Sequence, residues 1–154
     1  MWHFIRLFLC CLSLWGLSLS SQAATILVNS LADNLTTNSL CTLREAIDNA
    51  NANAAVHADC IAGSGATDTI QIDSGVLGAG PYIISLGSEL PAITSSVILK
   101  QSTSGASAGN FIIRGGTGFR IIRVNSGTVQ FFDLSMVNGN TVEGGALYID
   151  AAAN

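Results

Sequence analysis

The acidic side chains beyond residue 67 are the first candidates for chemistry. Sites that cut acidic polysaccharides cluster several carboxylates, which hold Ca²⁺ or act as general acid and base. Here no Asp-Asp or Asp-x-Asp pair occurs, and only Asp133 and Asp150 could align if neighbouring turns of the chain stack. We therefore predict no active site, metal site or cofactor site among these acids, which are Asp68, Asp73, Glu89, Asp133, Glu143 and Asp150.

The remaining charged candidates favour structural roles. Arg44 and Glu45 are neighbours, and neighbours on a helix point about 100° apart, so we expect a capping carboxylate and an arginine that bonds to loop carbonyls. His57 has no surrounding cluster of metal-ligating residues in the sequence, so we predict no metal site there. Three arginines could form a basic stripe for an anionic sugar, although isolated arginines on exposed strands more often serve solubility and edge protection: Arg114, Arg120 and Arg123.

Residues 1–23 have the layout of a secretory signal peptide. "MWHFIR" is basic, "LFLCCLSLWGLSL" is apolar, and small residues follow. We expect cleavage between Ala23 and Ala24. An uncleaved membrane anchor is the alternative, but the apolar run is shorter than the roughly 20 residues that a spanning helix needs.

Composition limits the partners and the domain count. The 154 residues carry a net charge of −4. Loss of Arg6 with the signal peptide leaves five basic residues against ten acidic, a net charge of −5. Nucleic acids and anionic membranes require clustered basic residues, so neither is expected as a partner. The chain has room for one small domain, and its many aliphatic residues argue against disorder.

The stretch before residue 68 is predicted to hold one strand and one helix. Residues 24–30 alternate and are rich in β-branched side chains, which predicts a strand. Thr42 and Glu45 have the spacing of a capping box, which predicts a helix over residues 42–53. Apolar residues recur on one face of this helix, at Leu43, Ile47 and Ala50.

Beyond residue 67, short apolar runs alternate with glycine-rich turns. No amphipathic helix of ten residues separates them, so β-sandwich and solenoid architectures remain. Two similar runs begin 26 residues apart, at residues 120 and 146, and such a period favours stacked repeats only weakly. The predicted strands are 68–73, 82–86, 96–100, 111–114, 120–124, 128–136 and 146–150.

One motif decides between these folds. "CTLREAIDNAN" resembles the Cys-Ser-Leu-Arg-Glu-Ala motif of the CSLREA domain family, with threonine in place of serine, and both hydroxyls can cap a helix. "DTIQI" and "ELPAI" resemble segments that follow in that family. The resemblance implies an all-β fold, a right-handed parallel β-helix of the pectate-lyase type, behind a short N-terminal capping helix. The motif residues are Cys41, Thr42, Leu43, Arg44, Glu45 and Ala46.

A second, less specific likeness lies near the end of the sequence. "NGNTVEGGALYI" resembles the Gly-Gly-Ala-aliphatic repeat of chlamydial polymorphic outer-membrane proteins, which are autotransporter adhesins. Such a resemblance implies an adhesive surface protein. The repeat residues are Gly144, Gly145, Ala146 and Leu147.

The helix and its flanking cysteines then have a structural explanation. The terminal coil of a solenoid exposes backbone groups and apolar interior, so it needs a cap. A helix this short is marginal alone. We expect a disulfide between Cys41 and Cys60, stable in an exported protein and worth on the order of 3 kcal/mol.

These inferences combine into one hypothesis. Residues 1–23 form the signal peptide, 24–67 the cap and 68–154 the β-helix coils, which we expect to be truncated at the C-terminus. The predicted function is that of a non-enzymatic protein, secreted or held at the cell surface or outer membrane, with a polysaccharide or host-surface ligand as the expected partner. The alternatives are the N-terminal part of a carbohydrate-active β-helix enzyme that lacks its catalytic coils, and a secreted β-sandwich binding module.

Overall fold

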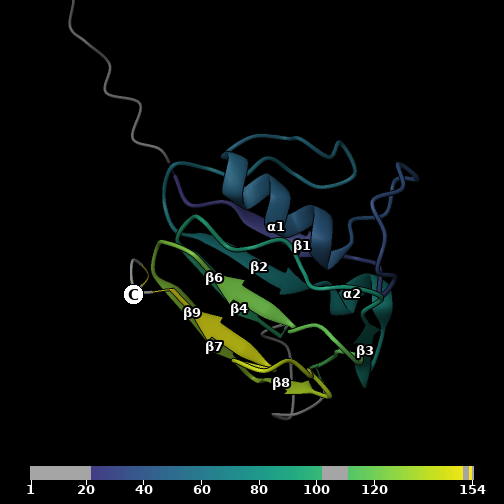
Figure 1. Ribbon diagram of the computed structural model, residues 1–154. Helices are drawn as coiled ribbons and strands as arrows, with labels where there is room; N and C mark the ends of the chain where they lie inside the picture. Colours follow the sequence, from purple (N-terminus) through teal and green to yellow (C-terminus); the bar gives the residue numbers. More distant parts are fainter. Residues whose placement is uncertain (1–21, 102–110, 151–152, 154) are drawn as a thin grey trace, which may run out of the picture.

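The computed structural model describes residues 22–101, 111–150 and 153. Nearly all of the predicted signal peptide and the glycine-rich turn at 102–110 lie outside the described residues. Strands dominate the described part, and they are β1 Thr25–Val28, β2 Asp68–Ile72, β3 Tyr82–Ser85, β4 Val97–Lys100, β5 Phe111–Arg114, β6 Ile122–Val124, β7 Val129–Phe132, β8 Leu134–Val137 and β9 Leu147–Ile149. Two helices accompany them, α1 Leu43–Ala52 and α2 Ser74–Leu77 (Figure 1).

Within the described residues, neither helix has the length and apolar character that a membrane-spanning segment requires.

All strand pairs between the described strands are parallel. They form three sheets with the orders β1-β2-β4-β7, β3-β5-β8 and β6-β9. A β-sandwich of the kind considered above pairs its strands antiparallel, so that alternative is wrong for these residues. The fold is mainly β, as predicted, and its sheets are parallel.

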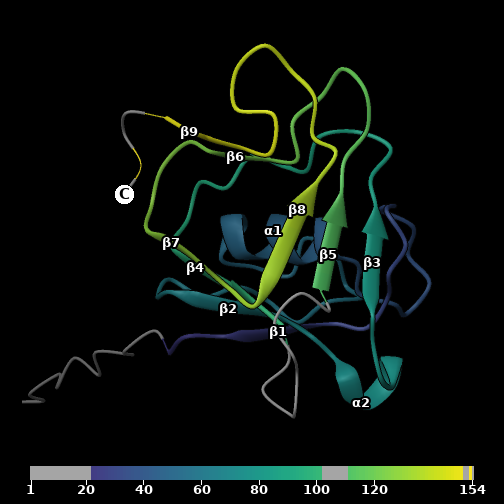
Figure 2. The ribbon, with the colours of Figure 1, turned by 90° about the horizontal axis from the view of Figure 1, so that it is seen from below.

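The register stacks equivalent apolar residues in columns. Ile70 pairs with Ile26 on one side and with Leu99 on the other, and Leu99 pairs in turn with Phe131. In the second sheet Ile84 pairs with Ile113. Figure 2 shows the three sheets on three sides of one interior, and these alternate side chains fill it. Burial of such aliphatic columns is the main stabilising contribution of the fold.

Helix α1 lies across the end of the interior that is next to β1. Figures 1 and 2 agree on this placement, and α1 contacts β1 and β2. Its buried face includes Leu43, Ile47 and Ala50, the three residues that the periodicity placed together. The helix therefore covers apolar side chains that would otherwise face water at this end.

One predicted strand was wrong, and one short helix was missed. The run 128–136 is not one strand, because Asp133 has a left-handed backbone (φ 52°) and separates β7 from β8. Helix α2 was not predicted, since four residues in a glycine-rich stretch carry no periodicity; Asp73 caps it by accepting hydrogen bonds from two backbone N–H groups. Phe131 and Phe132, adjacent in β7, point to opposite sides of the strand, and Phe132 is 49% exposed.

Candidate functional site

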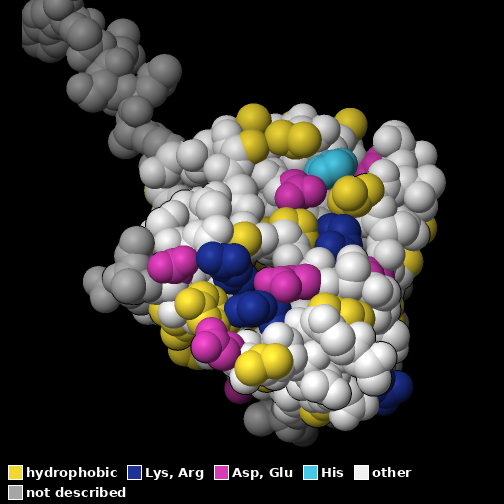
Figure 3. Space-filling view, in the orientation of Figure 1, with side chains coloured by type: hydrophobic (Ala, Val, Ile, Leu, Met, Phe, Trp, Pro, Cys, Tyr) yellow, Lys and Arg dark blue, Asp and Glu magenta, His cyan; other side chains and the backbone are white. Residues whose placement is uncertain are grey.

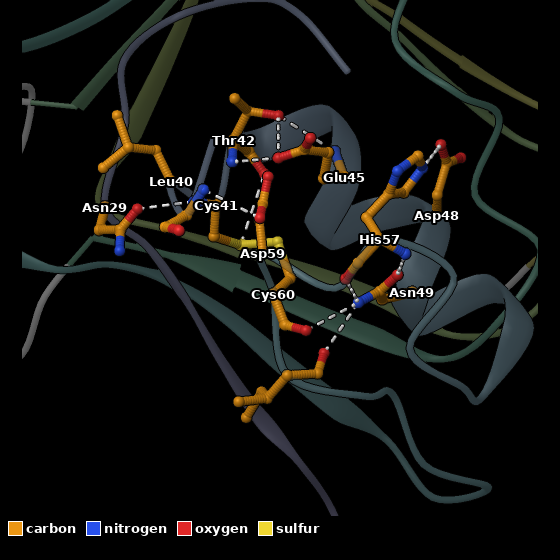
Figure 4. The surroundings of a disulfide bond; sticks show 12 residues. Asn29, Leu40, Cys41, Thr42, Glu45, Asp48, Asn49, His57, Asp59 and Cys60 are labelled. Carbon is orange, nitrogen blue, oxygen red and sulfur yellow. Dashed lines mark hydrogen bonds and ion pairs between the residues drawn. A yellow bond between two sulfur atoms is a disulfide. The ribbon is translucent and has the colours of Figure 1, made fainter. Parts of the chain in front are cut away.

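The start of α1 is a complete capping box. The backbone N–H of Thr42 donates to Glu45 Oε2 over 2.9 Å, and the backbone N–H of Glu45 donates to Thr42 Oγ1 over 3.3 Å (Figure 4). The Thr42 hydroxyl also lies 2.9 Å from the carbonyl oxygen of Asn34, to which it can donate. Both side chains are buried, so these bonds replace water that cannot reach the helix end. The prediction of a capping carboxylate is confirmed.

Substitutions at Thr42 test this arrangement. Thr42→Ser keeps the hydroxyl and should change the free energy of unfolding by less than about 0.5 kcal/mol. Thr42→Ala removes the cap and leaves a buried N–H without its acceptor, so it should cost about 1 to 2 kcal/mol. Urea unfolding followed by circular dichroism measures both values. Equal stability of the serine and alanine variants would show that the hydroxyl contributes nothing.

The predicted disulfide between Cys41 and Cys60 is confirmed, and it joins the start of α1 to the segment that returns after it. The Cys41 end is also tied to the end of β1, because its N–H donates to Asn29 Oδ1 over 2.7 Å. On the other side, the amide of Asn49 organises the returning segment: Nδ2 donates to the carbonyls of His57, Cys60 and Ile61. The disulfide and the side-chain amide of Asn49 together hold residues 57–61 against the helix (Figure 4).

Arg44 connects α1 to two loops. Its Nε and Nη2 donate to the two carboxylate oxygens of Asp33 over 2.9 and 3.0 Å, while Nη1 and Nη2 donate to the carbonyl oxygens of Glu89 and Ser88. Asp33 in turn accepts from the backbone N–H of Gly87 over 2.8 Å. The expectation that this arginine bonds to loop carbonyls is confirmed. Its carboxylate partner was missed, because nothing in the sequence ties Asp33 to Arg44.

His57 lies beside Asp48, with Nε2 3.0 Å from Oδ2. Across the described ranges, no group of three or more His, Cys, Asp or Glu side chains is arranged to hold a metal ion. The pair is therefore a contact between α1 and the segment 57–61, and among the described residues it is not part of a metal-binding set.

Charged side chains gather on the face that carries β6 and β9, below α1 (Figure 3). The guanidinium carbons of Arg120 and Arg123 lie 4.6 and 5.5 Å from the ring centre of Tyr148, which is the register partner of Arg123. Each arginine also has a carboxylate: Arg120 pairs with Glu89 at 3.4 Å and Arg123 with Asp150 at 3.2 Å. This cluster is neutral in formal charge, so it is not a free basic stripe.

Sequence reasoning missed the role of Tyr148, because the pairing of β6 with β9 brings it to the arginines from a distant part of the chain. It also left open whether Asp133 and Asp150 align. In the structure Asp133 lies between β7 and β8, whereas Asp150 follows β9 in another sheet. Arg114, the third arginine of the predicted stripe, ends β5 in the sheet β3-β5-β8.

The Gly-Gly-Ala-Leu motif forms the turn that leads into β9. A Cβ atom on Gly145 would lie 2.7 Å from the carbonyl oxygen of Gly139, and one on Gly139 would lie 1.9 Å from the carbonyl oxygen of Gly145. Only glycine permits this approach of two backbones. Gly144 has φ 57°, so it also supplies a left-handed position. The two glycines of the motif are thus explained by close backbone packing and a left-handed position within the β8–β9 connection.

The described surface includes two hollows that lie between loops. The larger, of about 460 Å³, lies between the turn at 115–117 and the turn at 138–140. The smaller, of about 340 Å³, lies where the C-terminal end of α1, with Asn53, meets the loops at 65–67 and 94–96. The larger hollow is lined by Gly115, Gly116, Thr117, Asn138, Gly139 and Asn140.

The comparisons with known proteins found no relative of this chain. No family model matches the chain, and searches of curated proteins and of solved structures find no significant match. The likeness to the CSLREA family therefore stays a prediction from the motif.

Proposed function

We propose that this chain belongs to an exported, non-enzymatic protein of the cell surface or extracellular space, built as a right-handed parallel β-helix and closed by α1. The observation that carries the proposal is the parallel register of all three sheets together with a disulfide-bonded helix across one end of their interior.

The order in which the chain visits the sheets supports the β-helix. It passes from β4 in the first sheet to β5 in the second, β6 in the third and back to β7 in the first, and each return places the new strand beside its predecessor. Ile93, between β3 and β4, bridges to Val124 of β6 and so occupies the third side of the preceding turn. Crossovers between parallel strands of one sheet are right-handed in about 98% of cases, which favours that hand.

The chemistry of α1 supports a capping role. An open end of a β-helix exposes backbone groups and apolar side chains that promote association with other chains. Here α1 turns an apolar face inward, and Arg44 bonds it to the carbonyls of residues 88 and 89. The disulfide supports export, because such bonds persist outside the reducing cytoplasm.

Several carboxylates beyond the cap have structural partners, which supports a non-enzymatic role. Glu89 and Asp150 pair with arginines. Asp68 accepts hydrogen bonds from the backbone N–H groups of Ala24 and Ser64 and from the Ser64 hydroxyl, and Asp73 caps α2. Adhesion through an exposed face, as the motif resemblances imply, fits such a scaffold better than catalysis.

Export is tested by expressing the full chain in a bacterium with a periplasm. We expect recovery from the periplasm, an N-terminus at Ala24 and no free thiol at positions 41 and 60. Leu14→Arg interrupts the apolar run, so this control should stay in the cytoplasm with residues 1–23 attached. Wild-type chain in the cytoplasm would contradict the proposal, and recovery in the membrane with residues 1–23 intact would contradict cleavage.

A further inference from the structure

We propose that the larger hollow, between the turns at 115–117 and 138–140, binds an uncharged sugar unit of a glycan. The inference rests on the proposed extracellular function and names its ligand class. The hollow of about 460 Å³ falls within the range of roughly 300–1,000 Å³ that is usual for small-ligand sites. One sugar ring with a linked neighbour fits such a volume.

The lining has the polar groups that sugar hydroxyls require. Thr117, Asn138 and Asn140 are all exposed, and among the described residues their side chains have no protein hydrogen-bond partner. An amide offers two donors and a carbonyl acceptor, while a threonine hydroxyl both donates and accepts. Sugar hydroxyls also act in both ways, so the amides can bind adjacent hydroxyls of one ring.

The lining carries no charge, which favours a neutral sugar over an anionic one. None of the six lining residues is ionisable, whereas the arginines on the face of β6 and β9 are engaged with carboxylates. A uronate or sulfate would lose water on entering the hollow and gain no cation in return. A neutral sugar gives up only hydroxyl hydrogen bonds, which the amides and exposed peptide groups replace.

The site is preformed by the pairing of its two turns. Thr117 and Asn140 form a parallel bridge, the N–H of Asn140 donates to the carbonyl of Phe119 over 3.0 Å, and that of Gly115 donates to the carbonyl of Val137 over 2.8 Å. Figure 2 shows the two connections, β5–β6 and β8–β9, leaving the neighbouring strands β5 and β8 at the same end of their sheet. These contacts fix the backbone that carries the three polar side chains, so binding has to order only the side chains, which limits the entropy lost.

Glycine substitution gives a clean test at the central amide. Asn138 has φ 60°, so Asn138→Gly removes the amide without imposing strain. Asn140→Ala removes the second amide. The matched control is Asn53→Gly, because Asn53 is also left-handed (φ 51°) and lies at the other hollow.

The experiment follows backbone and side-chain amide resonances of the isotopically labelled chain, purified from the periplasm, during titration with oligosaccharides. The neutral probes are the hexasaccharides of glucose, mannose, xylose and N-acetylglucosamine, and hexagalacturonate is the anionic probe. We expect at least one neutral probe to shift the signals of residues 115–117 and 138–140 saturably. Affinity for that probe should fall at least tenfold in Asn138→Gly/Asn140→Ala and stay unchanged in Asn53→Gly.

Any one of the following results would overturn the inference: no shift with any neutral probe, shifts confined to other residues, or tighter binding of hexagalacturonate. Unchanged affinity in the double variant would also overturn it. If the chain is exported, cleaved and disulfide-bonded but binds no neutral probe, the glycan site fails while the proposed function stands. If the chain stays in the cytoplasm, the proposed function fails whether or not a sugar binds.

Discussion

Removing the cross-link between Cys41 and Cys60 is expected to lower the free energy of unfolding by about 3 kcal/mol. The bond spans 19 residues, which include all of α1. Without the disulfide the unfolded chain gains the conformational freedom that the closed loop removes, while the short helix keeps only its packing, its capping box and its side-chain hydrogen bonds. For a chain of this size, such a loss corresponds to a fall in melting temperature of about 10 °C.

The measurement compares wild type and Cys41→Ala/Cys60→Ala in urea, with and without reductant. Both cysteines are buried, at 1% and 5% exposure, so the double alanine variant also loses some packing. Reduced wild type isolates the cross-link, since its thiols remain in place. Reductant should lower the unfolding midpoint of wild type and leave the variant unchanged. A wild-type midpoint that is insensitive to reductant, with free thiols demonstrated, would contradict the prediction.

Some of these features follow from neighbouring residues and could be predicted. The capping box depends only on Thr42 and Glu45, three residues apart, and the helix follows from their spacing. The strand segments follow from short β-branched runs between glycines. The break at Asp133 could not be predicted in this way, because "TVQFFDLSM" has a continuous strand pattern and only the turn between two sheets requires the left-handed residue.

Most contacts between residues that are far apart in the chain could not be predicted from the sequence. The stack of Arg120 and Arg123 on Tyr148 depends on the register of β6 and β9, which no local pattern specifies. The hollow at residues 138–140 depends equally on which turn lies beside it. Register of this kind is set by the packing of whole apolar columns. The local sequence identifies the strands, whereas the arrangement of functional groups on the surface requires the structure.

Loss of the Arg44 side chain is expected to have a comparable effect on stability. Arg44 and Asp33 are 12% and 8% exposed, and the guanidinium binds both carboxylate oxygens. Among the described residues, Arg44→Met would leave the nearly buried Asp33 carboxylate with the Gly87 N–H as its one hydrogen-bond donor, and two loop carbonyls would lose their donors. Breaking a buried pair in this way typically costs about 3 kcal/mol or more.

Arg123→Met is the matched control, because its ion pair with Asp150 is far more exposed, at 42% and 39%. We expect that substitution to cost less than about 1 kcal/mol in urea unfolding. Asp33→Asn combined with Arg44→Met removes both charges, so the double variant should be more stable than the sum of the single effects implies. Additive effects, or equal costs for Arg44→Met and Arg123→Met, would show that Arg44 does not stabilise the contact between α1 and the loops at 33 and 87–89 through its charge.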